Sequence, residues 1–140
     1  MFVLDTNVIS ELMRPTPNPV VVDWVAGHTA ANLFFSAVGE AELRYGLAIM
    51  PTGRRRDALA SEVEGMLSED FAGRILPFDS EATRAYARIA ADRRAIGRPI
   101  SQTDCQVGAI AHSRGMAVVT RNVRDFTDMG VNIIDPWTDT

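Results

Sequence analysis

The feature that most constrains the fold is the segment Phe2–Ser10, in which a short apolar run ends at an aspartate. Phe2–Leu4 shows no polar alternation, which is typical of a strand buried on both faces of a parallel sheet. Thr6 or Asn7 is placed to cap a helix that follows at once. Asp5 therefore lies at the carboxyl end of a strand, the edge of an α/β sheet where ligands bind. The segment itself leaves open a second interpretation, in which Asp5 only caps the helix.

Length and composition predict one ordinary domain. The chain has 140 residues, 46% of them hydrophobic, and no shift in composition divides it, so we expect a single domain over residues 1–140. The apolar runs are too short to span a membrane and no basic segment precedes them, so we expect no signal peptide, no membrane contact and a cytoplasmic location. Cys105 is the only cysteine, which excludes an internal disulfide and a thiolate cluster for zinc. His28 and His112 lack the spacing of metal ligands.

Strand-like and helix-like segments alternate along the chain. Further apolar runs predict strands at residues 32–36, 74–78, 116–119 and 131–134. The intervening segments predict helices at residues 20–26, 37–50, 54–69, 81–96 and 101–114. Pro77 places the third strand at an edge of the sheet, or ends it. The alternation predicts an α/β fold whose parallel sheet is covered by helices on both faces.

The helix expected over residues 37–50 carries a carboxylate on an apolar stripe. At about 100° per residue, Glu42 falls on the same stripe as Val38, Tyr45 and Ile49. A second apolar side is formed by Leu43, Leu47 and Met50. We therefore expect this helix to be covered on both sides and Glu42 to have a partner. Two interpretations stay open, a structural pair with an arginine and a cation or proton site.

Two further carboxylates lie in the first turns of expected helices. Asp104 is three residues after Ser101, which is the spacing of a capping box. Asp125 follows the fourth expected strand, in a polar turn behind Asn122. For each, a role at the helix terminus and a role as a ligand are both open. Capping alone accounts for Asp79, which precedes another helix.

The formal net charge of −4 argues against a protein that coats nucleic acid through long-range attraction, but it is compatible with an acidic pocket that holds cations. All fourteen basic residues are arginine, which suits phosphate binding and is equally explained by codon usage. Arg54, Arg55 and Arg56 open an expected helix, where positive charge opposes the helix dipole. We interpret them as candidate nucleic-acid contacts, the alternative being a solvated run of charge.

The acidic residues can meet at one place. Right-handed crossovers bring the strand ends that precede helices to the same edge of a parallel sheet, so Asp5, Glu42, Asp104 and Asp125 can converge there. Converging carboxylates repel one another unless cations lie among them, and oxygen ligands without histidine or cysteine suit Mg²⁺ or Mn²⁺. One or two such ions activate water for attack on a phosphodiester. Hydrolytic nuclease chemistry is the predicted function.

Four separated motifs resemble the PIN-domain ribonucleases, and within them the VapC and FitB type toxins of bacterial type II toxin–antitoxin pairs. The motifs are FVLDTNVISEL, SAVGEAELRYGL, ISQTDCQVGAIA and VVTRNVRDF, followed by a final DPW. The resemblance covers essentially the whole chain. It implies a three-layer α/β/α sandwich with four to five strands, an Mg²⁺ or Mn²⁺ site at Asp5, Glu42, Asp104 and Asp125, and RNA cleavage that leaves a 5′-phosphate.

The same resemblance implies an RNA substrate, a homodimer or a higher heteromeric assembly, and a small VapB- or FitA-like antitoxin whose other half binds operator DNA. Some relatives carry a carboxylate where this chain has Asn122. Whether Asp125 ligates the metal directly, through water, or only positions Asn122 is therefore open. Accessory hydrogen-bond donors to ligands or phosphate are expected at Thr6, Asn7, Thr120 and Asn122.

Two other functions are compatible with parts of the pattern. A phosphohydrolase of the haloacid-dehalogenase kind also begins with a strand ending in aspartate, but it uses a second aspartate as acid at the place occupied here by Asn7. A non-catalytic regulatory subunit would use the acidic cluster to bind the arginines of a partner.

Overall fold

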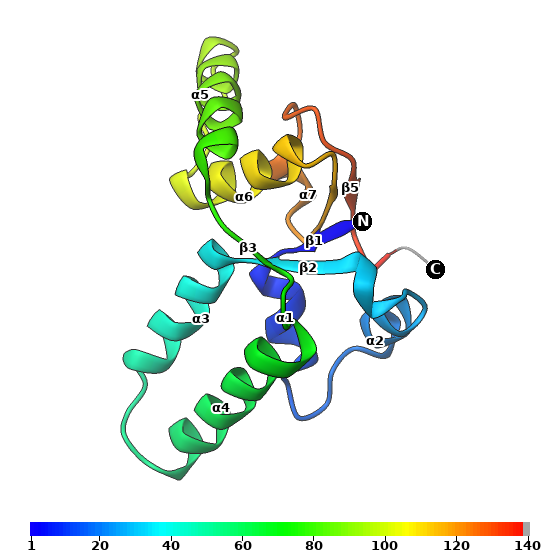
Figure 1. Ribbon diagram of the computed structural model, residues 1–140, viewed down its shortest axis with the longest axis vertical. Helices are drawn as coiled ribbons and strands as arrows, with labels where there is room; N and C mark the ends of the chain where they lie inside the picture. Colours follow the sequence, from blue (N-terminus) through cyan, green and yellow to red (C-terminus); the bar gives the residue numbers. More distant parts are fainter. Residues whose placement is uncertain (139–140) are drawn as a thin grey trace.

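The computed structural model describes residues 1–138, so the last two residues of the expected domain lie outside the described part. Within it, five parallel strands form one sheet in the order β3-β2-β1-β4-β5. The strands are β1 (Phe2–Leu4), β2 (Leu33–Ser36), β3 (Ile75–Leu76), β4 (Ala117–Val119) and β5 (Ile133–Ile134). Helices cover both faces of the sheet (Figure 1). The expected three-layer α/β/α architecture is confirmed.

Helices fill the connections between the strands. They are α1 (Thr6–Leu12), α2 (Pro19–Ala26), α3 (Ala37–Ala48), α4 (Arg54–Gly65), α5 (Ser80–Ala95), α6 (Gln102–Ser113) and α7 (Val123–Phe126). A short 3₁₀ turn at Ala30–Asn32 precedes β2, and α4 continues into a π-helical turn at Met66–Asp70. Across residues 1–138, each helix is too short or too polar to cross a lipid bilayer.

The central strand β1 explains why the sheet needs both helical layers. Successive side chains of a strand point to opposite faces. Val3 packs in a core with Ile89 of α5 and Ile110 of α6, whereas Leu4 packs in a second core with Val8 of α1. Both strand residues are almost fully buried, as the uninterrupted apolar run predicts.

Local signals at strand and helix ends have mixed outcomes. β3 lies at the edge of the sheet, as Pro77 predicts. Asp79 caps α5, since its carboxylate accepts a hydrogen bond from the Ala82 amide at 3.0 Å. The expected cap of α1 by Thr6 or Asn7 is wrong. Thr6 is already the first helical residue, so its free amide bonds the side chain before it.

The expectation that α3 is covered on both sides is also wrong. Tyr45 and Ile49 are 67% and 65% exposed, and Glu42 lies with them on the exposed stripe. The other side, with Leu43 and Leu47, packs against the core. Helices α3 and α4 form a hairpin that projects from the sheet (Figure 1), so only one side of α3 meets the domain.

Candidate acidic site

The four acidic residues expected to converge all lie at the carboxyl edge of the sheet. Asp5 follows β1, Glu42 is in the second turn of α3 after β2, and Asp125 is in α7 after β4. Asp104 is in the first turn of α6, which runs back against the strand direction so that its N-terminus returns to this edge. The topology therefore gathers carboxylates from α3, α6, α7 and the end of β1.

Asp5 is the most constrained of the four side chains. It is only 7% exposed, and its Oδ1 atom accepts a hydrogen bond from the Thr6 amide at 2.9 Å. Its Oδ2 atom accepts from the Thr120 hydroxyl at 2.8 Å and from Asn7 Nδ2 at 3.3 Å. Thr120 is fully buried at the end of β4, the strand that pairs with β1. Asp5 thus caps α1, and its carboxylate is also fixed in the acidic group.

Burial raises the pKa of Asp5 from 3.8, its ordinary value, to about 6, and the negative charges of Asp104 and Glu42 add to the increase. The hydrogen bonds from Thr120 and from the Thr6 amide act in the opposite direction. The ionised carboxylate is therefore a buried anion whose surroundings compensate its charge only in part. Such a position favours the approach of a cation.

The raised pKa of Asp5 predicts how stability changes with pH. The folded state binds this proton more tightly than the unfolded state, so the contribution is present below pH 3.8 and is lost as pH rises through about 6. A shift of this size corresponds to roughly 3 kcal/mol. In EDTA, the free energy of unfolding of the wild type minus that of Asp5→Asn should fall between about pH 4 and 7. A difference that is constant over this window would contradict the assignment.

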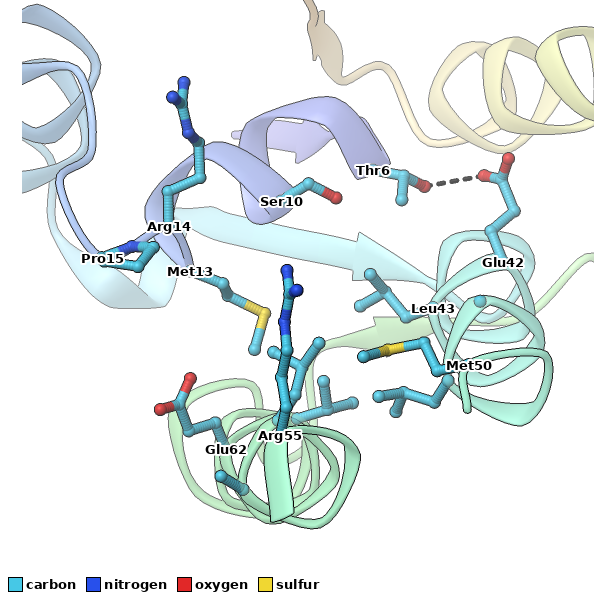
Figure 2. Close-up of a pocket in the computed structure, with 15 residues that line it drawn as sticks. Thr6, Ser10, Met13, Arg14, Pro15, Glu42, Leu43, Met50, Arg55 and Glu62 are labelled. Carbon is cyan, nitrogen blue, oxygen red and sulfur yellow. Dashed lines mark hydrogen bonds between the residues drawn. The ribbon is translucent and has the colours of Figure 1, made fainter. Parts of the chain in front are cut away.

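Glu42 and Asp104 are held less tightly. The Thr6 hydroxyl donates to Glu42 Oε1 at 2.7 Å, and Figure 2 shows this bond joining α1 to α3. The partner of Glu42 is thus a hydroxyl and not an arginine. Burial raises the pKa of Asp104, as does the charge of Asp125, whereas a hydrogen bond with Ser101 and the charge of Arg93 lower it.

The expected capping spacing at α6 is present. Ser101 is the N-cap residue, and its hydroxyl oxygen accepts a hydrogen bond from the Asp104 amide at 3.2 Å. At α7 the expected cap is only partly formed, because Asn122 is the N-cap residue but its side chain makes no capping bond. Asp125 is exposed and free to change rotamer.

The oxygen ligands suit a hard divalent cation, although the four carboxylates as they lie do not surround a common position for an ion. Within residues 1–138, no three Asp, Glu, His or Cys side chains stand close enough to hold an ion as they lie. The acids nevertheless act on one another through their charges, Asp5 with Asp104 and Glu42, and Asp104 with Asp125. Carboxylate oxygens are the ligands that Mg²⁺ and Mn²⁺ prefer. Glu42 and Asp125 are exposed, so their side chains have room to rotate.

The accessory residues form a polar network around Asp5. Asn7 Nδ2 also donates to the Thr120 hydroxyl at 3.2 Å, and Asn7 Oδ1 accepts from the Arg121 amide at 3.3 Å. The Asn122 amide donates to the same Thr120 hydroxyl at 3.0 Å. The loop after β4 is thereby tied to the start of α1.

A cleft of about 590 Å³ runs from the acidic site between α1, α3 and α4. Thr6 and Glu42 line one end, and Arg55 lines the wall formed by α4 (Figure 2). Arg54 is exposed, whereas Arg56 donates to the Met50 carbonyl at 3.5 Å. Of the arginine cluster, Arg55 therefore shares a cleft with a predicted acidic residue.

Sequence reasoning missed Arg93, which lies near Asp104 and contacts the segment that carries Asp125. A signal was present. Arg93 continues the four-residue spacing of Ala85 and Ile89 on the buried face of α5, and an arginine on an apolar stripe calls for a buried partner.

Comparisons with known proteins extend over nearly the whole chain. The family described as PIN domain matches residues 2–132. VapC ribonuclease Y4jK of Sinorhizobium fredii (strain NBRC 101917 / NGR234) is 42% identical over 98% of this chain and 98% of its own length. Toxin FitB of Neisseria gonorrhoeae (strain ATCC 700825 / FA 1090) is 37% identical over 99% of this chain and 100% of its own. The crystal structure of FitAcB from Neisseria gonorrhoeae superposes with a TM-score of 0.94 and 37% identity, over 99% of this chain and 100% of that one.

Proposed function

Because the chain belongs to the PIN-domain family, we propose that it is a metal-dependent endoribonuclease and the toxin of a bacterial type II toxin–antitoxin pair. Two relatives of nearly equal length support this proposal, since one is named a ribonuclease and the other a toxin. The observation that carries it is the buried Asp5 carboxylate, held at the carboxyl edge of the sheet within reach of the charges of Asp104 and Glu42.

We propose that Asp5, Glu42, Asp104 and Asp125 hold Mg²⁺ or Mn²⁺. Their oxygen-only donor set and the partly compensated charge at Asp5 support this assignment. A bound ion of this kind supplies an activated water and stabilises charge on the scissile phosphate.

The chain's own residues prepare the site for that reaction. Thr120, Asn7 and the Thr6 amide fix both oxygens of Asp5, so the carboxylate is oriented before a ligand arrives. The Thr6 hydroxyl, on α1, orients Glu42 on α3. Asp125 lies in the short helix α7, which follows β4, and its charge acts on Asp104.

Chelation provides the direct test of this function. Purified protein dialysed against EDTA should leave a structured RNA intact, and added Mg²⁺ or Mn²⁺ should restore cleavage with 5′-phosphate ends. Denaturing gels and end-labelling would measure the products. Cleavage that persists undiminished in EDTA, or products with 5′-hydroxyl ends, would contradict the proposal.

The arginine cluster supports a second expectation about the RNA. If Arg54, Arg55 and Arg56 bind phosphates, replacing all three by glutamine should weaken RNA binding and lower the slope of log K against log salt by up to about 2. Fluorescence anisotropy over a range of NaCl concentrations measures the slope. Arg84→Gln is a matched control, because Arg84 is an exposed arginine on α5 paired with Glu81. If the triple substitution leaves the slope unchanged, the three arginines do not bind phosphates and are solvated surface charges.

We further propose a small antitoxin of the VapB or FitA type as partner, with a DNA-binding half of its own. The solved FitAcB structure, which matches this chain over its full length, supports that pairing. We also propose that the protein is a homodimer. The uncovered apolar stripe on α3, with Tyr45 and Ile49, supports a contact that the isolated chain does not make.

A further inference from the structure

Arg93 is a buried cation in an unusual setting. It is 4% exposed and lies on the face of α5 that packs into the core with Ala82, Ala85 and Ile89. Within residues 1–138, no acidic oxygen lies within ion-pair distance of its guanidinium group. A buried charge without an ion partner costs free energy unless other polar groups satisfy it. The groups that satisfy Arg93 therefore show what it does.

The guanidinium group of Arg93 donates hydrogen bonds to three backbone carbonyls. Arg93 Nη1 donates to the carbonyls of Asp125 and Thr127 at 3.1 and 2.8 Å, and Arg93 Nε donates to the Arg98 carbonyl at 2.8 Å. One planar side chain thus joins the end of α5 to the end of α7. Arginine can do this because its donors form a rigid fork, whereas lysine offers a single point of charge.

Helix α7, whose last carbonyls Arg93 holds, has little stability of its own. Helix α7 spans only Val123–Phe126 and lacks a side-chain cap at Asn122. So short a helix gains almost no stability from its own hydrogen bonds and depends on its tertiary contacts. Arg98 adds to the same attachment, since it donates to Asp128 Oδ2 at 2.8 Å and to the Thr127 hydroxyl at 3.1 Å.

The attachment bears on the acidic site because α7 carries Asp125 and because the charge of Arg93 acts on Asp104. Helix α5 packs against α6, which carries Asp104, and Arg93 of α5 holds the end of α7, which carries Asp125. We infer that Arg93 is a positioning residue, which fixes Asp125 relative to Asp104 by holding the carbonyls at the end of α7. This inference rests on the proposed metal-dependent function.

The test compares Arg93→Lys, which keeps the charge and loses the fork, with Arg94→Lys, a matched control at the next and exposed position. Calorimetric titration with Mn²⁺ measures metal affinity, and hydrogen exchange in the metal-free protein measures opening of α7 at the Asp125 amide. Arg93→Lys should weaken Mn²⁺ binding about 10- to 100-fold, as loss of a group that orients a ligand does. The Asp125 amide should exchange faster, and kcat should fall with little change in KM for RNA. Arg94→Lys should behave as the wild type.

The outcomes separate the two proposals. Absence of Mn²⁺ binding by the wild type would overturn the proposed function and this inference with it. If the wild type binds Mn²⁺ and Arg93→Lys binds it with equal affinity, the inference about Arg93 is overturned and the proposed function is not. If Arg93→Lys does not fold, Arg93→Met takes its place, because methionine fills the apolar face of α5, leaves no buried charge and makes none of the three hydrogen bonds to the carbonyls. Weaker Mn²⁺ binding by that variant supports the positioning role, and unchanged binding overturns it.

Discussion

Asp5→Asn is expected to lower kcat/KM for RNA cleavage at least about 100-fold while the fold is retained. Asparagine keeps the shape of the side chain and can still accept the hydrogen bond from the Thr6 amide. The substitution removes the negative charge of Asp5, which lies near the negative charges of Asp104 and Glu42. Cleavage rates at saturating Mn²⁺ and the circular dichroism spectrum would measure activity and fold together.

Asp23→Asn is the matched control for this substitution. Asp23 is exposed on α2, a helix that contributes no residue to the acidic group. The control removes the same charge from the same chain and should leave cleavage at the wild-type rate. If Asp5→Asn and the wild type are equally active after contaminating nucleases have been removed, the assignment of Asp5 as a catalytic residue is wrong.

Phe35→Ala is expected to lower the free energy of unfolding by about 3–5 kcal/mol, a large share of the roughly 5–15 kcal/mol that stabilises a typical domain. Phe35 is completely buried at the end of β2, where its ring packs against Phe71 at a centroid distance of 5.9 Å. It also lies under the first turn of α3, so its loss should loosen the helix that carries Glu42. Urea unfolding measures the change.

Gly39 makes that contact testable in detail. A Cβ atom at Gly39 would lie 2.4 Å from the Phe35 ring, so Gly39→Ala should cost about 1–3 kcal/mol through overpacking. Phe35→Leu removes the ring and should make the same substitution at Gly39 less costly. The double-mutant cycle then gives a clear coupling energy. Strictly additive effects would show that the two residues do not press on each other.

The sequence was most informative where a local rule has one physical solution. Pro77 cannot donate to a sheet, and β3, which ends just before it, lies at the edge. Asp79 and Ser101 are short acceptors just before expected helices, and both cap helices. The acids could be placed at one edge because all the strands of a parallel sheet end at the same edge.

The failures concern properties that only packing decides. The apolar stripe of Glu42 indicated burial on both sides of its helix, but the α3–α4 hairpin projects from the sheet and leaves Tyr45 exposed. Which of the fourteen arginines is buried depends on how α5 packs on α6. The spacing of Arg93 with Ala85 and Ile89 points to the buried face of α5, but it does not say which groups the guanidinium contacts there. How closely the four carboxylates approach one another is likewise set by side-chain rotamers, which sequence spacing does not determine.

The position of β1 in the middle of the sheet has a consequence for how this domain is made. Its hydrogen-bonding neighbours are β2 and β4, and Asp5 meets Thr120 across a sequence separation of 115 residues. While β4 is still inside the ribosome during translation, β1 has no hydrogen-bonding neighbour at one of its edges. Asp5 then lacks its hydrogen bond from the Thr120 hydroxyl. Closing so long a loop is slow compared with forming the helices. Asp5 therefore reaches its final surroundings late, after almost the entire domain has been translated.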